Sequence, residues 1–379
     1  MLIVIMLAAA AALCYLLTPL FIRAAHRFGL LDYPQELKLH PKPVPFLGGM
    51  AVFVSFWTIV FAGIYTSRFF LEHSLVPPSD LHVLLSGIVS VARKIVWIFI
   101  GGAAILAVGF FDDKYRWSPL RKLLGQIAAS LVLMSQGLTI NLVEPLGPLG
   151  YLATFVWVLL IINAFNFIDS LDGHCAGIAI VSGMMLLWIT QIIDQPFTAL
   201  FLAAFTGALV GFFPYNFKPA RIFLGDNGSL FIGYMMAAFT LLCRYYTPQA
   251  TYATAFIPVL IFGVPLYDSV SVIAVRLYRG LPPWKGDRNH FAHRLVKMGM
   301  SDRVAVAFSF LIAIAIGHLA ILLTQVDWFG ASLVGIVYFF MIIIIALLEY
   351  YAARRQHFVE QLSGENKRRR EDVDKAMRL

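Results

Sequence analysis

Acidic side chains stand at the ends of very apolar stretches at three places in this chain. The three acidic motifs are Asp112-Asp113, the run from Asn163 to Gly173 that contains Asp169 and Asp172, and Gly225-Asp226-Asn227-Gly228-Ser229. A carboxylate at membrane depth or at its edge is costly, so five of them need an explanation. Carboxylates can hold a divalent metal ion together with the phosphates of a ligand. The motifs therefore predict one site for a divalent metal and a phosphorylated ligand.

The first motif places two carboxylates side by side after an apolar stretch. At a helix end, Asp112 and Asp113 could bind Mg²⁺ or accept a proton from a nucleophile. The alternative is a surface pair of acids that is neutralised by Lys114, Arg116 or Arg121.

The second motif repeats polar side chains every three residues, at Asn163, Asn166, Asp169 and Asp172. On a helix, neighbours at this spacing share a face. Because such side chains are costly beside an apolar run, we expect them to face a polar cavity. For Asn163, hydrogen bonding to another helix is the alternative. Gly173 indicates that the helix does not continue straight through the motif.

The third motif surrounds Asp226 with glycines directly before a predicted helix. Gly225 and Gly228 allow a close approach of the backbone, and a helix N-terminus favours a phosphate. This pattern suits a carboxylate that holds Mg²⁺ beside a diphosphate. A simple N-cap role for Asp226 is the alternative.

Two further segments carry cations. The segment 284–295 contains His290, His293 and Arg294, and an Arg side chain can contact a phosphate through two hydrogen bonds. We expect no zinc there, because no further soft ligands accompany the histidines. An ordinary basic loop is the alternative.

The segment 38–49 is rich in proline and therefore stiff. Its Lys42 or His40 could face an anionic ligand, and a purely structural connection is the alternative.

The composition indicates an integral membrane protein. Hydrophobic residues make up 60% of the 379 residues and charged residues 13%, whereas soluble domains carry roughly 25% charged residues. Because spans of about 17–25 residues fit a bilayer, we predict an all-α chain with eleven transmembrane helices. Their ranges are 2–22, 47–66, 95–111, 123–139, 150–167, 175–193, 197–213, 229–243, 254–275, 304–324 and 328–352. Residues 1–352 would form one membrane domain, and 353–379 a basic cytoplasmic tail.

Lys and Arg are unevenly distributed between the two sides of these helices. Alternate connections and the tail, beginning with the loop after the first helix, hold 25 of the 29. The positive-inside rule therefore places the N-terminus outside and the C-terminus in the cytoplasm. All three acidic motifs and the histidine segment fall on the cytoplasmic side. A site at that face can use a cytosolic, nucleotide-activated substrate.

The motifs resemble, in their order, those of the polyprenyl-phosphate N-acetylhexosamine-1-phosphate transferases, glycosyltransferase family 4. The matching patterns are His-x-x-Pro-Val-Pro-x-x-Gly-Gly from His40, the Asp112 pair, Asn-x-x-Asn-Phe-x-Asp-x-x-Asp-Gly from Asn163, and Gly-Asp-x-Gly-Ser from Gly225. The resemblance covers the first ten helices. It implies transfer of a sugar-1-phosphate from a UDP-sugar to a polyprenyl phosphate, with release of UMP and use of Mg²⁺, or alternatively Mn²⁺.

The same resemblance implies roles for individual residues. Asp226 would bind the metal, with Asp112 or Asp113 as a further ligand or as the group that deprotonates or orients the lipid phosphate. Lys122 matches a lysine of the family site, and Lys122 and Asp169 would act in catalysis together with Asp112 and Asp113. Residues that match other positions of the site are Asn166, Asp169, Asp172, Asn216 and Phe223, with Asp172 and Phe223 at the uridine.

The histidine segment bears on the sugar. His290-Phe-Ala-His293-Arg294 is similar to the His-x-His-His-Arg pattern of the WecA- and TagO-like group, with Ala292 at the middle histidine. The eleventh helix and the tail also resemble that group. We therefore expect UDP-GlcNAc and undecaprenyl phosphate as substrates, with another UDP-N-acetylhexosamine or UDP-MurNAc-pentapeptide as the alternative donor.

Two choices stay open at this point. The reaction could be a direct attack by the lipid phosphate or a two-step route through an aspartyl-phosphate on Asp112 or Asp113. An ion-coupled transporter is the alternative class, since such proteins also carry intramembrane carboxylates. We expect a multi-pass protein of the bacterial inner membrane with no nucleic-acid partner. The resemblance leaves a homodimer open.

Overall fold

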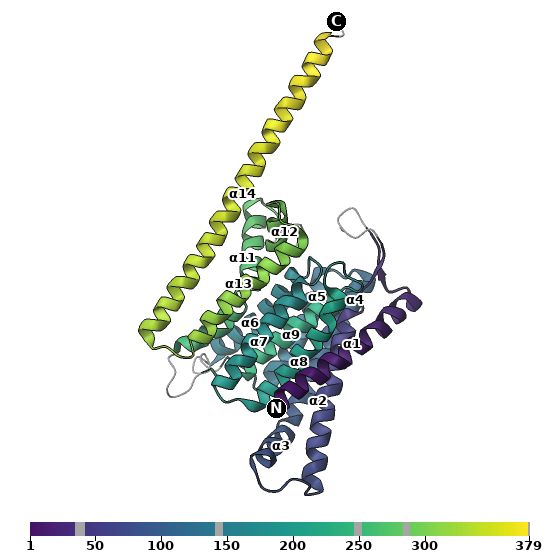
Figure 1. Ribbon diagram of the computed structural model, residues 1–379, viewed down its shortest axis with the longest axis vertical. Helices are drawn as coiled ribbons and strands as arrows, with labels where there is room; N and C mark the ends of the chain where they lie inside the picture. Colours follow the sequence, from purple (N-terminus) through teal and green to yellow (C-terminus); the bar gives the residue numbers. More distant parts are fainter. Residues whose placement is uncertain (35–41, 141–146, 246–251, 283–288, 378–379) are drawn as a thin grey trace.

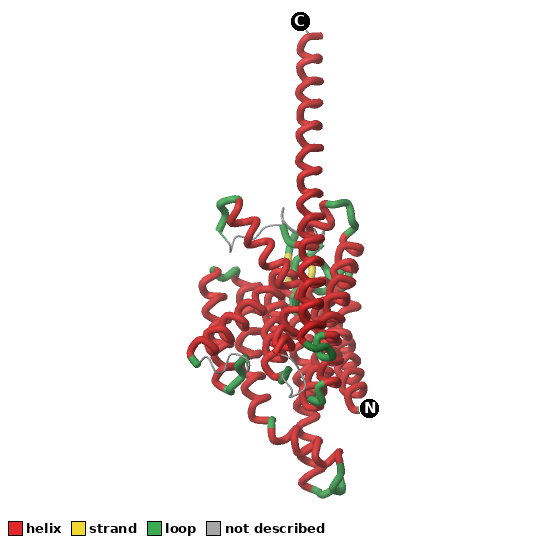
Figure 2. The backbone as a smooth tube through the Cα atoms, turned by 90° about the vertical axis from the view of Figure 1, so that its left-hand side faces the viewer, coloured by secondary structure: helices red, strands yellow, loops and turns green. Residues whose placement is uncertain are grey.

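Helices form almost all of the regular structure in the computed structural model, which describes residues 1–34, 42–140, 147–245, 252–282 and 289–377 (Figure 2). The longer helices are α1 (Leu2–Phe28), α2 (Gly48–Glu72), α4 (Ala92–Tyr115), α5 (Pro119–Ser135), α6 (Pro148–Ile168), α7 (His174–Ile192), α8 (Pro196–Asn216), α9 (Gly225–Leu242), α11 (Gly263–Tyr278), α13 (Asp302–Leu322) and α14 (Trp328–Met377). The shorter elements are α3 (Asp80–Ser90), the 3-10 helix η2 (Tyr252–Phe256), α10 (Ile257–Ile261), α12 (Phe291–Lys297), β1 (Leu31–Asp32) and β2 (Val44–Pro45).

The predicted architecture, an all-α protein with several membrane-spanning helices, is confirmed. Eight helices in the described part of the chain are long and apolar enough to cross a membrane. A ninth span results if Tyr252–Ile261 and Gly263–Tyr278, which meet at an angle of 71°, count as one. Each of the eleven predicted ranges coincides with a helix or with this bent pair, but α5 and α9 are not among the candidate spans. The number eleven therefore stays a prediction, as does the orientation in the membrane.

The centre of the bundle is α9, which packs against α2, α4 and α6 (Figure 1). Its large side chains, among them Phe231, Tyr234 and Phe239, are completely buried. A helix that is apolar all round suits such a central position. Its neighbours therefore fix the N-terminus of α9, where Asp226 lies.

Glycines let two helices approach this N-terminus closely. A Cβ atom on Gly109 of α4 would lie 2.4 Å from the Cα of Asn227, and one on Gly49 of α2 would lie 2.2 Å from the Cα of Gly228. Any larger residue would push these backbones apart. The close packing brings the end of α4, with Asp112 and Asp113, to the start of α9.

Backbone hydrogen bonds fasten the α8–α9 loop to the connection between α1 and α2. In that connection β1 pairs with β2 in antiparallel register, Leu31 opposite Pro45. The Phe223 N–H donates to the Pro45 carbonyl at 2.8 Å, and the Gly48 N–H donates to the Phe223 carbonyl at 3.0 Å. Segments far apart in the sequence are thereby joined beside the third acidic motif.

The last helix, α14, lies at the edge of the bundle and extends well beyond it (Figures 1 and 2). It runs without a break from Trp328 to Met377. The sequence placed a domain boundary at 352, inside this helix. The division into a membrane domain and a tail stays a prediction.

Candidate active site

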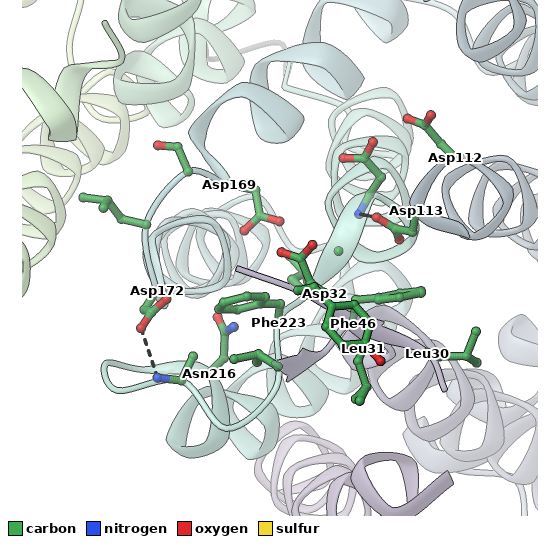
Figure 3. A pocket seen from close by; sticks show the side chains of 18 of the residues that line it. Leu30, Leu31, Asp32, Phe46, Asp112, Asp113, Asp169, Asp172, Asn216 and Phe223 are labelled. Atoms are coloured by element: carbon green, nitrogen blue, oxygen red, sulfur yellow. Dashed lines mark hydrogen bonds between the residues drawn. The ribbon is translucent and has the colours of Figure 1, made fainter. Parts of the chain in front are cut away.

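A cavity of about 1000 Å³ brings the three acidic motifs together. Its walls come from the end of α1, the β1–β2 pair, the end of α4, the α6–α7 turn, the α8–α9 loop, α12 and the start of α13 (Figure 3). The predicted site residues that line it are Lys42, Asp112, Asp113, Asp169, Asp172, Asn216, Phe223, Asp226 and His293. The prediction that the three acidic motifs form one site, which rested on the cost of carboxylates near apolar runs, agrees with this cavity.

Asp113 caps the N-terminus of α9. Its Oδ1 accepts the Asp226 N–H at 2.9 Å, and its Oδ2 accepts the Asn227 N–H at 3.0 Å and the Asn227 side-chain amide at 2.7 Å. An acid at this position satisfies backbone donors that a helix start leaves unpaired. Both oxygens of Asp113 are therefore engaged in holding the third motif against α4.

Lys122 of α5 lies between two carboxylates. Its Nζ is 2.5 Å from Asp226 Oδ2 and 3.1 Å from Asp112 Oδ2, and it donates to Asn166 Oδ1 at 3.1 Å. The Asn166 amide in turn donates to Asp226 Oδ1 and to Ser229 Oγ, both at 2.8 Å. The result is a network in which one cation offsets two acids, and one amide orients Asp226.

The same two carboxylates are the candidate metal ligands. No group of three or more His, Cys, Asp or Glu side chains in the described residues is arranged to hold a metal ion. Mg²⁺ is usually bound by one or two carboxylates and completed by substrate phosphates and water. Asp112 and Asp226 therefore fit a metal that is completed by the phosphates of a ligand.

Asp169 follows the last residue of α6 and faces the cavity (Figure 3). Burial raises the pKa of its carboxyl group well above the usual range, and the nearby acids Asp226 and Asp113 raise this pKa further. A carboxyl group with a raised pKa keeps its proton to a higher pH than a free aspartate does. This environment suits the catalytic role predicted for Asp169.

Asp172 and Asn216 stabilise the loops around the cavity. Asp172 Oδ2 accepts the Ala220 N–H at 3.0 Å (Figure 3, dashed line). The buried Asn216 donates its side-chain amide to the Ile222 carbonyl at 3.0 Å. Each has one polar atom committed to the α8–α9 loop, so both shape the wall next to Phe223. Their predicted contacts with a substrate stay predictions.

Asn163 is paired with a residue of another helix. Its side-chain amide donates to Gln126 Oε1 at 2.8 Å, and the Gln126 amide donates back to Asn163 Oδ1 at 3.2 Å. This is the interhelical hydrogen bonding given above as the alternative, here between α6 and α5. The pair lies one turn of α6 from Asn166.

The predicted histidine segment reaches the cavity through α12. His293 lines the cavity, whereas His290 contacts Asp268 and Arg294 contacts Glu349. Lys42 also lines the cavity. His40 lies outside the described residues, as do positions 284–288 of the histidine segment.

Some acids and cations of the site were missed. Asp32 of β1, Lys218 of the α8–α9 loop and Asp302 at the start of α13 also line the cavity, and Lys218 and Asp302 form an ion pair. Asp32 follows Leu30-Leu31 and Asp302 begins the apolar helix α13, so the cost of a carboxylate near an apolar run could have marked both acids.

Comparisons with known proteins agree with this arrangement. The family model described as glycosyl transferase family 4 matches residues 95–244, which contain all three acidic motifs. A Bacillus subtilis protein named probable undecaprenyl-phosphate N-acetylglucosaminyl 1-phosphate transferase is 32% identical over 85% of each chain. The chain belongs to this family.

Other members of the family are similar over most of the chain. A Mycolicibacterium smegmatis protein named decaprenyl-phosphate N-acetylglucosaminephosphotransferase is 29% identical over 76% of this chain and 73% of its own length. An Escherichia coli protein named undecaprenyl-phosphate alpha-N-acetylglucosaminyl 1-phosphate transferase is 27% identical over 81% of each chain. The predicted resemblance is thereby confirmed.

Proposed function

We propose that this protein transfers N-acetylglucosamine-1-phosphate from UDP-GlcNAc to undecaprenyl phosphate. The products are polyprenyl-diphospho-GlcNAc and UMP. The observation that carries the proposal is the Lys122 network, in which one lysine and one asparagine hold two carboxylates at the wall of a large cavity. The names of the relatives support the sugar and the lipid.

In the proposed reaction an oxygen of the lipid phosphate attacks the sugar-linked phosphorus of UDP-GlcNAc. A new diphosphate bond forms, the old one breaks, and UMP leaves with the bonding electron pair. Both reactants are anionic, so the site must offset their repulsion. Lys122 supplies a fixed positive charge next to Asp112 and Asp226. Mg²⁺ held by these two acids would neutralise the diphosphate and stabilise the leaving oxygen.

We propose the direct route, and the hydrogen bonds of Asp113 disfavour a covalent intermediate on that residue. A two-step route through Asp113 would require an oxygen that is already bound to the N-terminus of α9. Asp112, whose Oδ2 forms an ion pair with Lys122 and which lines the cavity, is better placed to orient or deprotonate the lipid phosphate. Stereochemical analysis at phosphorus separates the routes: inversion is expected, and retention would mean that a covalent intermediate forms.

The remaining wall would bind the donor. Asp172 and Phe223 would contact the uridine, and Lys42 and His293, which lie on other parts of the wall, would contact the phosphates or the sugar. Asp169 would hold or move a proton near the reacting phosphates.

We place the protein in the bacterial inner membrane with this cavity at the cytoplasmic face. The excess of Lys and Arg in the connections on that side supports this orientation. A homodimer is compatible with the proposal but is not required by it, because one chain supplies the whole acidic network.

The direct test is UMP release by the purified full-length chain in detergent with Mg²⁺ and undecaprenyl phosphate. We expect release with UDP-GlcNAc and little with UDP-MurNAc-pentapeptide. Release with the pentapeptide donor alone would show that the sugar is misassigned. An absence of release with both, from folded protein, would contradict the proposed function.

A further inference from the structure

The short helix α12 carries three predicted site residues on different sides. Its His293 lines the cavity, while His290, at its N-cap, and Arg294 point to other helices. A helix of seven residues has little stability of its own. Its orientation, and with it the position of His293, must therefore come from contacts with the rest of the protein.

The first such contact is Asp268 of α11, a fully buried acid. Its Oδ2 is 2.9 Å from Nδ1 of His290, and its Oδ1 accepts the backbone N–H of Phe291. One carboxylate thus binds both the side chain at the N-cap and the first residue of α12. The ring of His290 also lies against Phe167, with the ring centres 5.8 Å apart.

The second contact is Glu349 of α14. Its Oε1 is 2.8 Å from Arg294 Nε, and its Oε2 accepts the hydroxyl of Tyr267 at 2.6 Å. The guanidinium group also donates to Ser271 Oγ at 2.6 Å. Both charged side chains are mostly buried, with 16% and 11% of the side-chain surface exposed. An ionised pair in such surroundings needs this full set of hydrogen bonds.

The position of Glu349 is unusual for its helix. The membrane-spanning part of α14 is strongly apolar, and only 11% of its most apolar window is buried in the protein. An acid in such a segment is costly and calls for a specific partner. Its partner here is not in the catalytic network but in α12, at the residue next to His293.

We propose that Asp268 and Glu349 are positioning residues that hold α12 so that His293 faces the cavity. The last helix would then contribute to donor binding although none of its described residues lines the cavity. This inference rests on the proposed function, in which His293 contacts the UDP-sugar. It separates the roles of the histidine segment: one side chain meets the substrate, and two hold the helix.

The test is a double-mutant cycle between each carboxylate and His293. Glu349→Ala and Asp268→Ala should each raise KM for UDP-GlcNAc about tenfold, with a smaller change in kcat and an unchanged KM for undecaprenyl phosphate. In a His293→Ala background the same changes should have almost no further effect, because they act through His293. Glu349→Gln and Asp268→Asn retain hydrogen-bonding atoms and should stay closer to wild type.

A matched control and a second readout separate this role from a general loss of stability. Ser182→Ala removes another buried interhelical hydrogen bond, to the Ile261 carbonyl, and should leave KM unchanged. Hydrogen exchange of residues 289–298 should rise in Glu349→Ala and Asp268→Ala but not in the control. If Asp268→Ala does not fold, the Glu349 variants alone test the inference. Glu349 lies on α14 at the edge of the bundle, where a substitution is tolerated more easily than at the fully buried Asp268.

The possible outcomes are distinct. The inference would be overturned if Glu349→Ala and Asp268→Ala raised KM as much in the His293→Ala background as in wild type. It would also be overturned if the hydrogen exchange of α12 were unchanged in these variants. If the wild type released no UMP from either donor, the proposed function would fail, while the exchange measurement would still show whether the two carboxylates hold α12.

Discussion

Replacement of Lys122 by methionine tests the catalytic network. The change keeps most of the side-chain volume but removes the charge between Asp112 and Asp226, which lie 3.1 and 2.5 Å from Nζ. Only 18% of the lysine side chain is exposed, and the two acids are 13% and 30% exposed. Water can therefore replace the lost partner only in part.

The size of the effect follows from this partial burial. Removing one partner of a buried ion pair costs about 3–5 kcal/mol, and the exposed part of Asp226 favours the lower end. If the ion pair stabilises the transition state relative to the free enzyme and substrates, losing 3 kcal/mol corresponds to a decrease of roughly a hundredfold in kcat/KM. Lys122→Arg keeps the charge with a different shape and should lose less.

The assay is UMP release at saturating Mg²⁺, with melting in detergent as a check of folding. Arg68→Met is a suitable control, because it breaks the exposed Arg68–Glu72 pair, and such pairs contribute about 0–1 kcal/mol. A decrease of less than about threefold for Lys122→Met would refute the reasoning, since an interaction of this strength would then be absent from the reaction.

Three further predictions concern packing, protonation and the metal. Gly109→Ala should destabilise the protein by about 1–3 kcal/mol and reduce activity, because its Cβ would lie 2.4 Å from Asn227; Gly335→Ala, with no atom within 4 Å, should not. Asp169→Asn should raise the melting temperature at pH 8 but lose activity. Because the pKa of Asp169 is raised in the folded state, wild-type stability falls as pH rises above the usual aspartate value of about 4. The increase in melting temperature of Asp169→Asn over wild type should therefore vanish toward pH 4. An increase that became larger in acid would contradict a raised pKa of Asp169 in the folded state. EDTA should abolish UMP release and added Mg²⁺ restore it; full activity in EDTA would exclude the proposed metal.

Much of the fold was predictable because long apolar runs form membrane helices. The break between α10 and α11 was not predicted, although Pro258, Gly263 and Pro265 lie beside it and such residues commonly interrupt helices. The two short elements near the site, β1–β2 and α12, are held by contacts with distant segments, such as Phe223 with Pro45. Local sequence carries no record of such contacts.

The sequence predicted which residues belong to the candidate site better than it predicted the role of each residue. The cost of Asp112, Asp113 and Asp226 near apolar runs pointed to a shared site, but only the structure shows that Asp113 caps α9. Lys122 came from the family resemblance, because one lysine in a basic connection is unremarkable.

Asp268 and Glu349 could have been identified from the sequence as residues with specific partners, but they were not among the predicted site residues. Each is an acid inside an apolar helix, so the same cost rule would have marked both. Their partners, His290 and Arg294, lie 22 and 55 residues away in the sequence. No spacing rule connects residues at such separations.

The most direct test of the central claim is to follow the β-phosphorus of UDP-GlcNAc. Full-length protein is incubated with Mg²⁺, undecaprenyl phosphate and donor labelled at that phosphorus, and the lipid and water-soluble fractions are separated. If the proposed transfer is correct, the label enters the lipid with wild type and stays soluble with Asp226→Asn. Label that remained in soluble UDP while the sugar entered the lipid would contradict it, because a different bond of the donor would then be broken.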